Sequence, residues 1–210
     1  MDSENLAQRT AAASETSSAP AFDGSALAGR EVAFLIAPEG AEQSEMLRPW
    51  EAVLMAGGHA VLVCPKDGEA QLFEHLDRGT RVPVDRTLSE ADPADYDALV
   101  LPGGVANPDL LRTDPKAVAF ATAFFEAGKP VAAICHAPWL LVEADLVKDR
   151  ALTSWPSLHT DVANAGGTWR DEEVVVCEGG PNVLVTSRKP QDLLAFCETM
   201  VRRFAAAAPR

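Results

Sequence analysis

Short, continuous apolar runs alternate with stretches of helical pattern along this chain, and this alternation constrains the fold more than any other feature. The apolar runs cover residues 32–37, 59–64, 98–101 and 131–134, and helices are predicted between them, at residues 44–56 and 115–127 among others. Strands that are apolar along their whole length are buried on both faces, as in parallel sheets covered by helices. The sequence therefore predicts an α/β fold, with a mostly parallel sheet between two layers of helices.

The ends of the chain differ in character. Residues 174–177 and 183–186 predict a hairpin, and residues 191–204 predict a final amphipathic helix. Residues 1–28 are rich in Ala, Ser, Thr and Glu and lack apolar periodicity, which predicts a mobile tail, with a short docking arm as the alternative. With 210 residues in total, we expect one α/β domain over residues 29–207.

Composition narrows the function. The net charge of −13 argues against a nucleic-acid partner, because phosphate binding needs a basic face. No apolar run is long enough to cross a bilayer, and the N-terminus lacks the pattern of a secretory signal, so we expect no membrane partner and a cytoplasmic location. The four cysteines show no zinc-binding spacing. We expect no metal and no cofactor, and we interpret Cys64, Cys177 and Cys197 as core or near-core residues.

Cys135 ends an apolar run, and Pro138 opens a helical pattern three residues later. This predicts a strand, a sharp turn and a helix, with the thiol at the apex of the turn, as for the serine of α/β-hydrolases. A helix N-terminus stabilises a thiolate, so we expect Cys135 to have a depressed pKa and to be the most reactive of the four thiols. The alternative is a buried structural cysteine. The strand-to-helix transition and the adjacent His136 favour the nucleophile.

Residues 97–104 (DALVLPGG) and 129–138 (KPVAAICHAP) resemble the PfpI intracellular cysteine protease family. That family lies in the glutamine-amidotransferase-like superfamily, which also includes a parkinsonism-associated deglycase. Residues 40–46, 152–156 and 164–166 match further family segments, so the resemblance runs from about residue 30 to residue 204. It implies a flavodoxin-like three-layer sandwich with a nucleophile elbow, the sharp turn that presents the cysteine.

The resemblance also implies a Cys–His–acid site. In this sequence Cys135 matches the nucleophile, and Glu42 matches an acid that donates a hydrogen bond to it as a protonated carboxyl. His136 matches the base, and Asp109 the acid that orients it from a neighbouring subunit, which implies a homodimer or higher homo-oligomer. Glu42 could instead be an exposed loop acid, with Glu39 and Glu45 close by, and Asp109 could cap a short helix.

The remaining site residues follow from the same alignment. The backbone N–H groups of Gly104 and His136 are expected to form an oxyanion hole, and Gly103 and Trp155 to line the pocket. Glu42, the Gly-Gly pair and Cys135 each follow a predicted strand, and ligands of open α/β sheets bind at the carboxyl ends of strands. These groups are therefore expected to converge in one site.

The resemblance implies a stress-protective enzyme that acts on reactive dicarbonyls such as methylglyoxal, or on their protein adducts, as a glyoxalase or deglycase. Peptide hydrolysis at the same site is the alternative, with a small aldehyde or a peptide as substrate. A non-enzymatic cysteine redox sensor or chaperone is the rival from another class. A glutamine amidotransferase is disfavoured, because the chain has no histidine after His159 and so lacks that enzyme's distant histidine.

Overall fold

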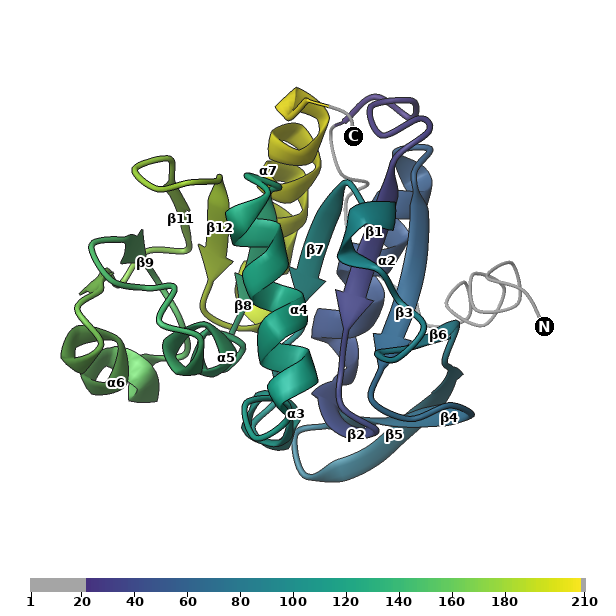
Figure 1. Cartoon of the computed structure of the whole chain (residues 1–210), viewed down its shortest axis with the longest axis horizontal. Helices are drawn as coiled ribbons and strands as arrows, with labels where there is room; N and C mark the ends of the chain where they lie inside the picture. Colours follow the sequence, from purple (N-terminus) through teal and green to yellow (C-terminus); the bar gives the residue numbers. More distant parts are fainter. Residues whose placement is uncertain (1–21, 209–210) are drawn as a thin grey trace.

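The computed structural model describes residues 22–208 and is built around a seven-stranded sheet (Figure 1). In sheet order its strands are β11 (Val174–Cys177), β12 (Leu184–Ser187), β8 (Val131–Ile134), β7 (Ala98–Leu101), β1 (Glu31–Leu35), β3 (His59–Cys64) and β6 (Arg86–Thr87). All neighbours pair in parallel except β11 and β12, which are antiparallel. The predicted α/β sheet, and the hairpin at its C-terminal edge, are confirmed.

Helices cover both faces of this sheet, as the continuous apolar strands require. The helices are α2 (Gln43–Met55), α3 (Ala106–Leu111), α4 (Pro115–Glu126), α5 (Pro138–Glu143), α6 (His159–Asn164) and α7 (Leu193–Ala206). Side chains alternate between two apolar clusters along each strand. In β1, Phe34 packs toward α2 and α7, whereas Leu35 packs toward α4 and α5. The three layers are therefore helices, sheet and helices.

Two smaller sheets, which the sequence did not predict, lie at the margins of the main one. One contains β2 (Glu39–Glu42), β4 (Glu69–Glu74) and β5 (Asp77–Pro83), and the other pairs β9 (Ala151–Leu152) with β10 (Thr168–Trp169). Single 3₁₀ turns cover Pro93–Asp95, Pro156–Leu158 and Pro190–Asp192. The β4–β5 hairpin is tied to the start of α2, where Gln43 Nε2 donates to Glu74 Oε1 and the Thr80 N–H donates to Gln43 Oε1, both at 2.6 Å.

The domain begins earlier than the predicted boundary at residue 29. Leu27 is fully buried in the core beside α2, and its N–H donates to the Ala56 carbonyl at 2.8 Å. One buried leucine in a polar stretch is too weak a pattern to mark this contact in the sequence. Residues 1–21 of the predicted mobile tail lie outside the described residues.

Phe124 of α4 offers a test of this core. It is fully buried against Tyr96 and Phe120, with ring centroids 6.5 and 5.4 Å away. We expect Phe124→Ala to lower the free energy of unfolding by about 3–5 kcal/mol in urea titration, because the truncation removes buried area and leaves a cavity. Leu76→Ala is the matched control, since Leu76 is 93% exposed between β4 and β5 and should change stability by less than about 0.5 kcal/mol. Equal losses in the two variants would contradict this core assignment.

Candidate active site

Cys135 lies at a sharp turn between β8 and α5. The strand ends at Ile134, Cys135 has a φ of +63°, and α5 begins at Pro138. This left-handed backbone is uncommon for a residue other than glycine, so the surrounding structure has to hold it. The Cys135 N–H donates to the Ser187 carbonyl at 3.0 Å, and its carbonyl accepts from the Trp155 N–H at 2.8 Å. The predicted turn with the thiol at its apex is confirmed.

The side chain of Cys135 is enclosed, with only 6% of the residue exposed. Gly103, at the carboxyl end of the neighbouring β7, gives it room. A Cβ at this glycine would lie 2.5 Å from the Cys135 Cβ and would also collide with the Glu45 carboxyl. The predicted position of Gly103 beside the thiol is therefore observed, and its missing side chain is what lets the cysteine and an acid meet.

That acid is Glu45, and the prediction that Glu42 lies beside the sulfur is wrong. Glu45 is fully buried in the first turn of α2, where it interacts with the Cys135 thiol and with the backbone N–H groups of Gly103 and Gly104. Glu42 precedes the helix and turns toward the β4–β5 hairpin, where its Oε2 accepts from the His75 N–H at 2.9 Å. Glu42 is the N-cap of α2 and has an extended backbone, so its side chain leaves the helix, whereas Glu45 in the first turn is buried.

The sequence contained a signal for Glu45. The buried positions of α2 are Glu45, Met46, Pro49, Trp50, Ala52 and Val53, which form one stripe at helical spacing. An acid at the start of an apolar stripe is expected to point into the core. Glu42 lies one position before the helix and therefore outside the stripe.

Burial determines the protonation state of Glu45. Loss of solvation, and secondarily the charge of Glu42, raise its pKa to about 8, which the Cys135 thiol and the N–H groups of Gly104 and Gly103 only partly offset. Both oxygens of this carboxyl are buried, and neither forms a well-aligned hydrogen bond to the described residues. At neutral pH Glu45 is therefore mostly a neutral acid that can donate a hydrogen bond, which is the property expected of Glu42.

The electrostatics of Cys135 differ from the expectation of a depressed pKa. Burial, and then the charge of Glu45 once that acid ionises, raise the pKa of Cys135, and the backbone N–H groups of Gly104 and His136 only partly oppose this shift. The short α5 begins three residues beyond the cysteine, and the Cys135 N–H is used by Ser187. The resting site therefore holds a protonated thiol, with two N–H groups directed at its sulfur.

His136 is the adjacent base and is also neutral. Its Nδ1 lies 3.2 Å from the Cys135 Sγ, and burial lowers its pKa to about 4. Its ring stacks on Trp155, with centroids 5.8 Å apart, and meets the edge of Trp139 at 5.2 Å. The predicted pairing of thiol and imidazole is observed, and Trp155 lies against the site as predicted.

Gly104 adopts a backbone that brings its N–H to the sulfur. Its φ is +86°, and a Cβ there would collide with the Gly40 carbonyl and lie 2.7 Å from the Glu42 nitrogen. Any side chain at this position would push β7 and the β2 segment apart. The N–H groups of Gly104 and His136 therefore both reach the Cys135 sulfur.

Asp109 does not reach His136 within the described part of the chain. It lies on α3 with 63% of its side chain exposed, and its Oδ1 is 4.0 Å from the Nε of Arg112. That guanidinium also lies 3.7 Å from the Glu143 carboxylate and 5.7 Å from the centre of the Trp139 ring. If Asp109 orients a histidine, the histidine must belong to another subunit, as the sequence predicted.

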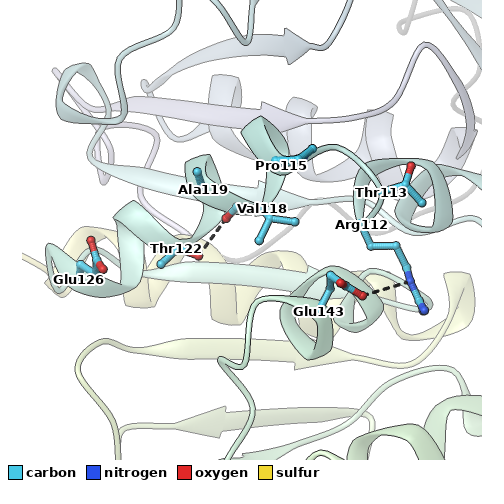
Figure 2. A pocket seen from close by; sticks show the side chains of 8 residues that line it. All are labelled: Arg112, Thr113, Pro115, Val118, Ala119, Thr122, Glu126 and Glu143. Atoms are coloured by element: carbon cyan, nitrogen blue, oxygen red, sulfur yellow. Dashed lines mark hydrogen bonds and ion pairs between the residues drawn. The ribbon is translucent and has the colours of Figure 1, made fainter.

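A groove of about 690 Å³ runs along α4, and Arg112 and Glu143 reach each other across one end of it (Figure 2). Neither Cys135 nor His136 lines this groove. It is lined by Arg112, Thr113, Pro115, Val118, Ala119, Thr122, Glu126 and Glu143. The groove is therefore distinct from the enclosed thiol site.

Comparisons with known proteins identify the family of this chain. The family model described as the DJ-1/PfpI family matches residues 30–203. The chain belongs to the DJ-1/PfpI family. It is 40% identical over 177 residues to protein/nucleic acid deglycase 2 of Escherichia coli (strain K12), which covers 84% of this chain and 99% of that protein.

Two further members of the DJ-1/PfpI family show the same likeness. Deglycase PfpI of Pyrococcus furiosus is 40% identical over 172 residues, covering 82% of this chain and 98% of that protein. A two-domain crystal structure from Anabaena variabilis, with DJ-1/ThiJ/PfpI-like and ferritin-like domains, matches with a TM-score of 0.76 and 34% identity. That match covers 86% of this chain and 50% of the two-domain chain. The flavodoxin-like fold implied by the sequence is therefore confirmed as the fold of this family.

Residues 22–208 also bear on two other classes of function, metal binding and membrane insertion. No group of three or more His, Cys, Asp or Glu side chains there is arranged to hold a metal ion. None of the helices in the same range has both the length and the apolar character needed to span a bilayer.

The protonated state of Glu45 can be tested through stability. Its folded pKa of about 8 lies above the ordinary value of 4.5, so its contribution is complete below about pH 4.5 and is lost as the pH rises through about 8. We expect the wild type to lose roughly 4 kcal/mol of unfolding free energy between about pH 5 and pH 9 from this group. Glu45→Gln should remove this component of the pH dependence, as measured by urea unfolding across the range.

Glu39→Gln is the matched control, because Glu39 is exposed on β2. It should leave the wild-type pH dependence intact. If Glu45→Gln follows the same curve as wild type, Glu45 is not a buried neutral acid.

Proposed function

We propose that this protein is a cysteine-dependent enzyme that converts reactive dicarbonyls, or their protein adducts, with Cys135 as nucleophile. The observation that supports this most is the cluster around one sulfur: His136 Nδ1 at 3.2 Å, the buried acid Glu45, and the N–H groups of Gly104 and His136. Two relatives that are 40% identical over most of their length are named deglycases. The cluster provides a nucleophile, a base and donors for a developing oxyanion.

Enclosure of the thiol favours a small substrate. Cys135 is only 6% exposed and lies between Gly103 and the ring of His136, which is itself covered by Trp155. A polypeptide would have to enter this space with its backbone extended, whereas a two- or three-carbon aldehyde needs little room. We therefore favour a dicarbonyl, or the end of a side chain modified by one, over a peptide.

Cys135, His136 and Glu45 are all neutral at the start of the first step. As the Cys135 sulfur forms a bond to the aldehyde carbon, the π electrons of the carbonyl move to its oxygen, where the N–H groups of Gly104 and His136 stabilise the negative charge. His136 Nδ1 takes the thiol proton and passes it to that oxygen, giving a hemithioacetal. Because thiol and imidazole both start neutral, proton transfer accompanies bond formation, and protonated Glu45 stabilises the negative charge on sulfur by hydrogen bonding.

The same groups can complete the reaction of a 1,2-dicarbonyl. His136 removes the hydrogen from the carbon bound to sulfur, and a proton returned to the adjacent carbon yields a hydroxyacyl thioester. Water then attacks the thioester carbon, the carbon–sulfur bond breaks, and the thiol is regenerated with release of a hydroxy acid. Water is the only co-reactant that these steps consume.

Loss of Cys135 tests the nucleophile. We expect Cys135→Ser to lower kcat/KM on methylglyoxal and glyoxal by roughly a thousandfold or more, because a serine hydroxyl beside a weak base is a far poorer nucleophile than a thiol. Cys197→Ala is the control, since Cys197 is a buried residue of α7. Fluorogenic peptides, assayed with the same variants, test the alternative of peptide hydrolysis. Unchanged dicarbonyl turnover in Cys135→Ser would refute the proposal, and no turnover by the wild type would favour the redox sensor.

The pH profile tests the roles of His136 and Glu45. Protonation of His136 below about pH 4 removes the base, and ionisation of Glu45 above about pH 8 places a negative charge against the developing thiolate. We expect a bell-shaped kcat/KM with limbs near these values, and Glu45→Gln should remove the alkaline limb while keeping part of the activity. An alkaline limb that persists unchanged in Glu45→Gln would exclude Glu45 as its source.

We further propose that the active unit is at least a dimer, with Asp109 of one subunit orienting His136 of another. Asp109 is exposed on α3, and the neighbouring Val105 and Leu110 are exposed apolar residues, 58% and 44% accessible. Apolar side chains beside a polar one on a free surface fit a subunit interface better than a solvated face. Arg112 also pairs with Glu143, so the Arg112 guanidinium would keep a partner if Asp109 turned toward another subunit.

A mixed oligomer tests this shared site. If Cys135→Ala and Asp109→Ala are each inactive alone, coexpression should restore up to about half of the activity of each mixed dimer, because one site receives both defects and the other receives neither. Asp114→Ala is the control, since Asp114 caps α4 through the Lys116 N–H at 2.9 Å. A verified mixed dimer without recovered activity would refute sharing.

A further inference from the structure

Arg150 is a buried cation far from Cys135. It is 3% exposed just before β9, and its guanidinium lies over the Phe125 ring at 5.7 Å. Its Nη1 donates to Asn182 Oδ1 at 2.9 Å, and its Nη2 donates to the Asn182 carbonyl at 2.8 Å and the Cys177 carbonyl at 3.1 Å. Its Nε donates to the Cys177 Sγ at 3.2 Å. Four hydrogen bonds thus fix the guanidinium.

None of these hydrogen bonds to oxygen supplies a counter-ion for the positive charge of Arg150. Burying an unpaired ion is strongly unfavourable, and arginine stays protonated in proteins. Three of the four acceptors are amide oxygens, which cannot ionise. Among the acceptors that Arg150 contacts in the described part of the chain, Cys177 Sγ alone can carry a negative charge. The buried Arg150 guanidinium therefore favours a Cys177 thiolate as its counter-ion.

Glu178, the charged residue next to Cys177 in the chain, lies on the opposite face of the sheet. Cys177 packs in the cluster of α4 and α5, whereas its neighbour Val176 packs against α7. Glu178 follows the same alternation and pairs with Arg203 of α7 at 2.6 Å. Burial raises the pKa of Cys177, but hydrogen bonds from Arg150 and from the Gly179 and Ala151 N–H groups outweigh it and lower the pKa.

The cover over this pair is thin. β11 is an edge strand (Figure 1), and the exposed residues 178–181 follow it directly. A Cβ at Gly179 would have no neighbour within 4 Å, whereas one at Gly180 would collide with the Arg150 guanidinium. Cys177 is 7% exposed, similar to Cys135. The loop of residues 178–181, which contains two glycines, therefore separates the sulfur from solvent.

We propose that Cys177 and Arg150 form a second reactive-thiol site, separate from Cys135, at which Cys177 is held as a thiolate and reacts with small electrophiles, hydrogen peroxide among them. Cys177 pairs with Leu184 at the beginning of β12, whereas Cys135 follows the end of β8, so the two thiols lie at opposite ends of the parallel strands. This site goes beyond the proposed function and does not depend on it.

The chemistry of the site is a simple substitution. With hydrogen peroxide, the thiolate sulfur forms a bond to one oxygen as the O–O bond breaks, giving a sulfenic acid and hydroxide, so sulfur loses two electrons and peroxide gains them. With iodoacetamide, sulfur bonds to the methylene carbon and iodide leaves. The Arg150 N–H groups can still donate to the oxygen of a sulfenic acid.

Labelling kinetics test the reactivity. The folded full-length protein is treated with iodoacetamide near pH 7, and each cysteine is followed by mass spectrometry. We expect Cys177 to react at least about tenfold faster than Cys197, whose pKa burial raises to about 12. The rate at Cys177 should be unchanged in Cys135→Ser and should fall in Arg150→Met. Peroxide followed by dimedone should label Cys177 as a sulfenic acid. Labelling of Cys177 no faster than of Cys197 would overturn the proposal.

The thermal stability of Cys177 variants tests the thiolate independently. This measurement does not require a reagent to reach the sulfur, and it does not require an Arg150 variant. Cys177→Asp keeps an anion beside Arg150, whereas Cys177→Ser leaves only neutral acceptors. We expect the Asp variant to have the higher Tm at neutral pH. A folded thiol pKa below the unfolded value of about 8.5 gives stability that is complete above that value and lost as the pH falls through the folded pKa. The Tm advantage of wild type over Cys177→Ser should therefore shrink as the pH is lowered.

The two tests separate the parts of the proposal. A Ser variant more stable than the Asp variant at neutral pH would refute the thiolate. A more stable Asp variant combined with slow labelling of Cys177 would refute the reactive site and leave a structural ion pair. Because the labelling is also carried out in Cys135→Ser, failure of the proposed dicarbonyl activity would not affect either result.

Discussion

The left-handed backbone of Cys135 is the constraint on which the site depends. A φ of +63° is costly for a residue with a side chain, and hydrogen bonds to Ser187 and from Trp155 hold it from two other segments of the chain. The turn can therefore exist only once β12 and the segment after β9 have packed. It directs the sulfur toward the end of β7, where Gly103 leaves space for Glu45. The arrangement of nucleophile, acid and base follows from this one strained residue.

Burial then determines the chemistry of the site. Removing solvent raises the pKa of Glu45 and of Cys135 and lowers that of His136, so each shift favours the neutral form. A neutral acid, thiol and imidazole can share protons without holding an ion pair in the core. The N–H groups of Gly104 and His136 supply the polarity that the neutral groups lack, and they do so with little reorganisation because the backbone is fixed.

Two of the four thiols show how strongly surroundings control one residue type. Cys135 and Cys177 have similarly small exposed fractions, and each lies at the end of a strand of the same sheet. Burial, followed by the Glu45 carboxyl, raises the pKa of Cys135, whereas under the thinner cover of Cys177 hydrogen bonds from Arg150 and two backbone N–H groups outweigh burial and lower the pKa. The local sequence of Cys177, an apolar strand followed by glycines, shows no sign of Arg150, which lies 27 residues earlier in the chain.

The sequence by itself determined the α/β class, the strands at residues 59–64, 98–101 and 131–134, and the turn at Cys135, because a buried strand and a strand-to-helix transition leave local patterns. It also identified the family and the pairing of Cys135 with His136. The apolar stripe of α2 indicated that Glu45 points into the core, but only the tertiary structure decided that its carboxyl meets the Cys135 sulfur, that the β4–β5 hairpin takes Glu42, and that Arg150 contacts Cys177. Each of these contacts depends on which distant segments pack together. Such packing is not contained in a local pattern of residues.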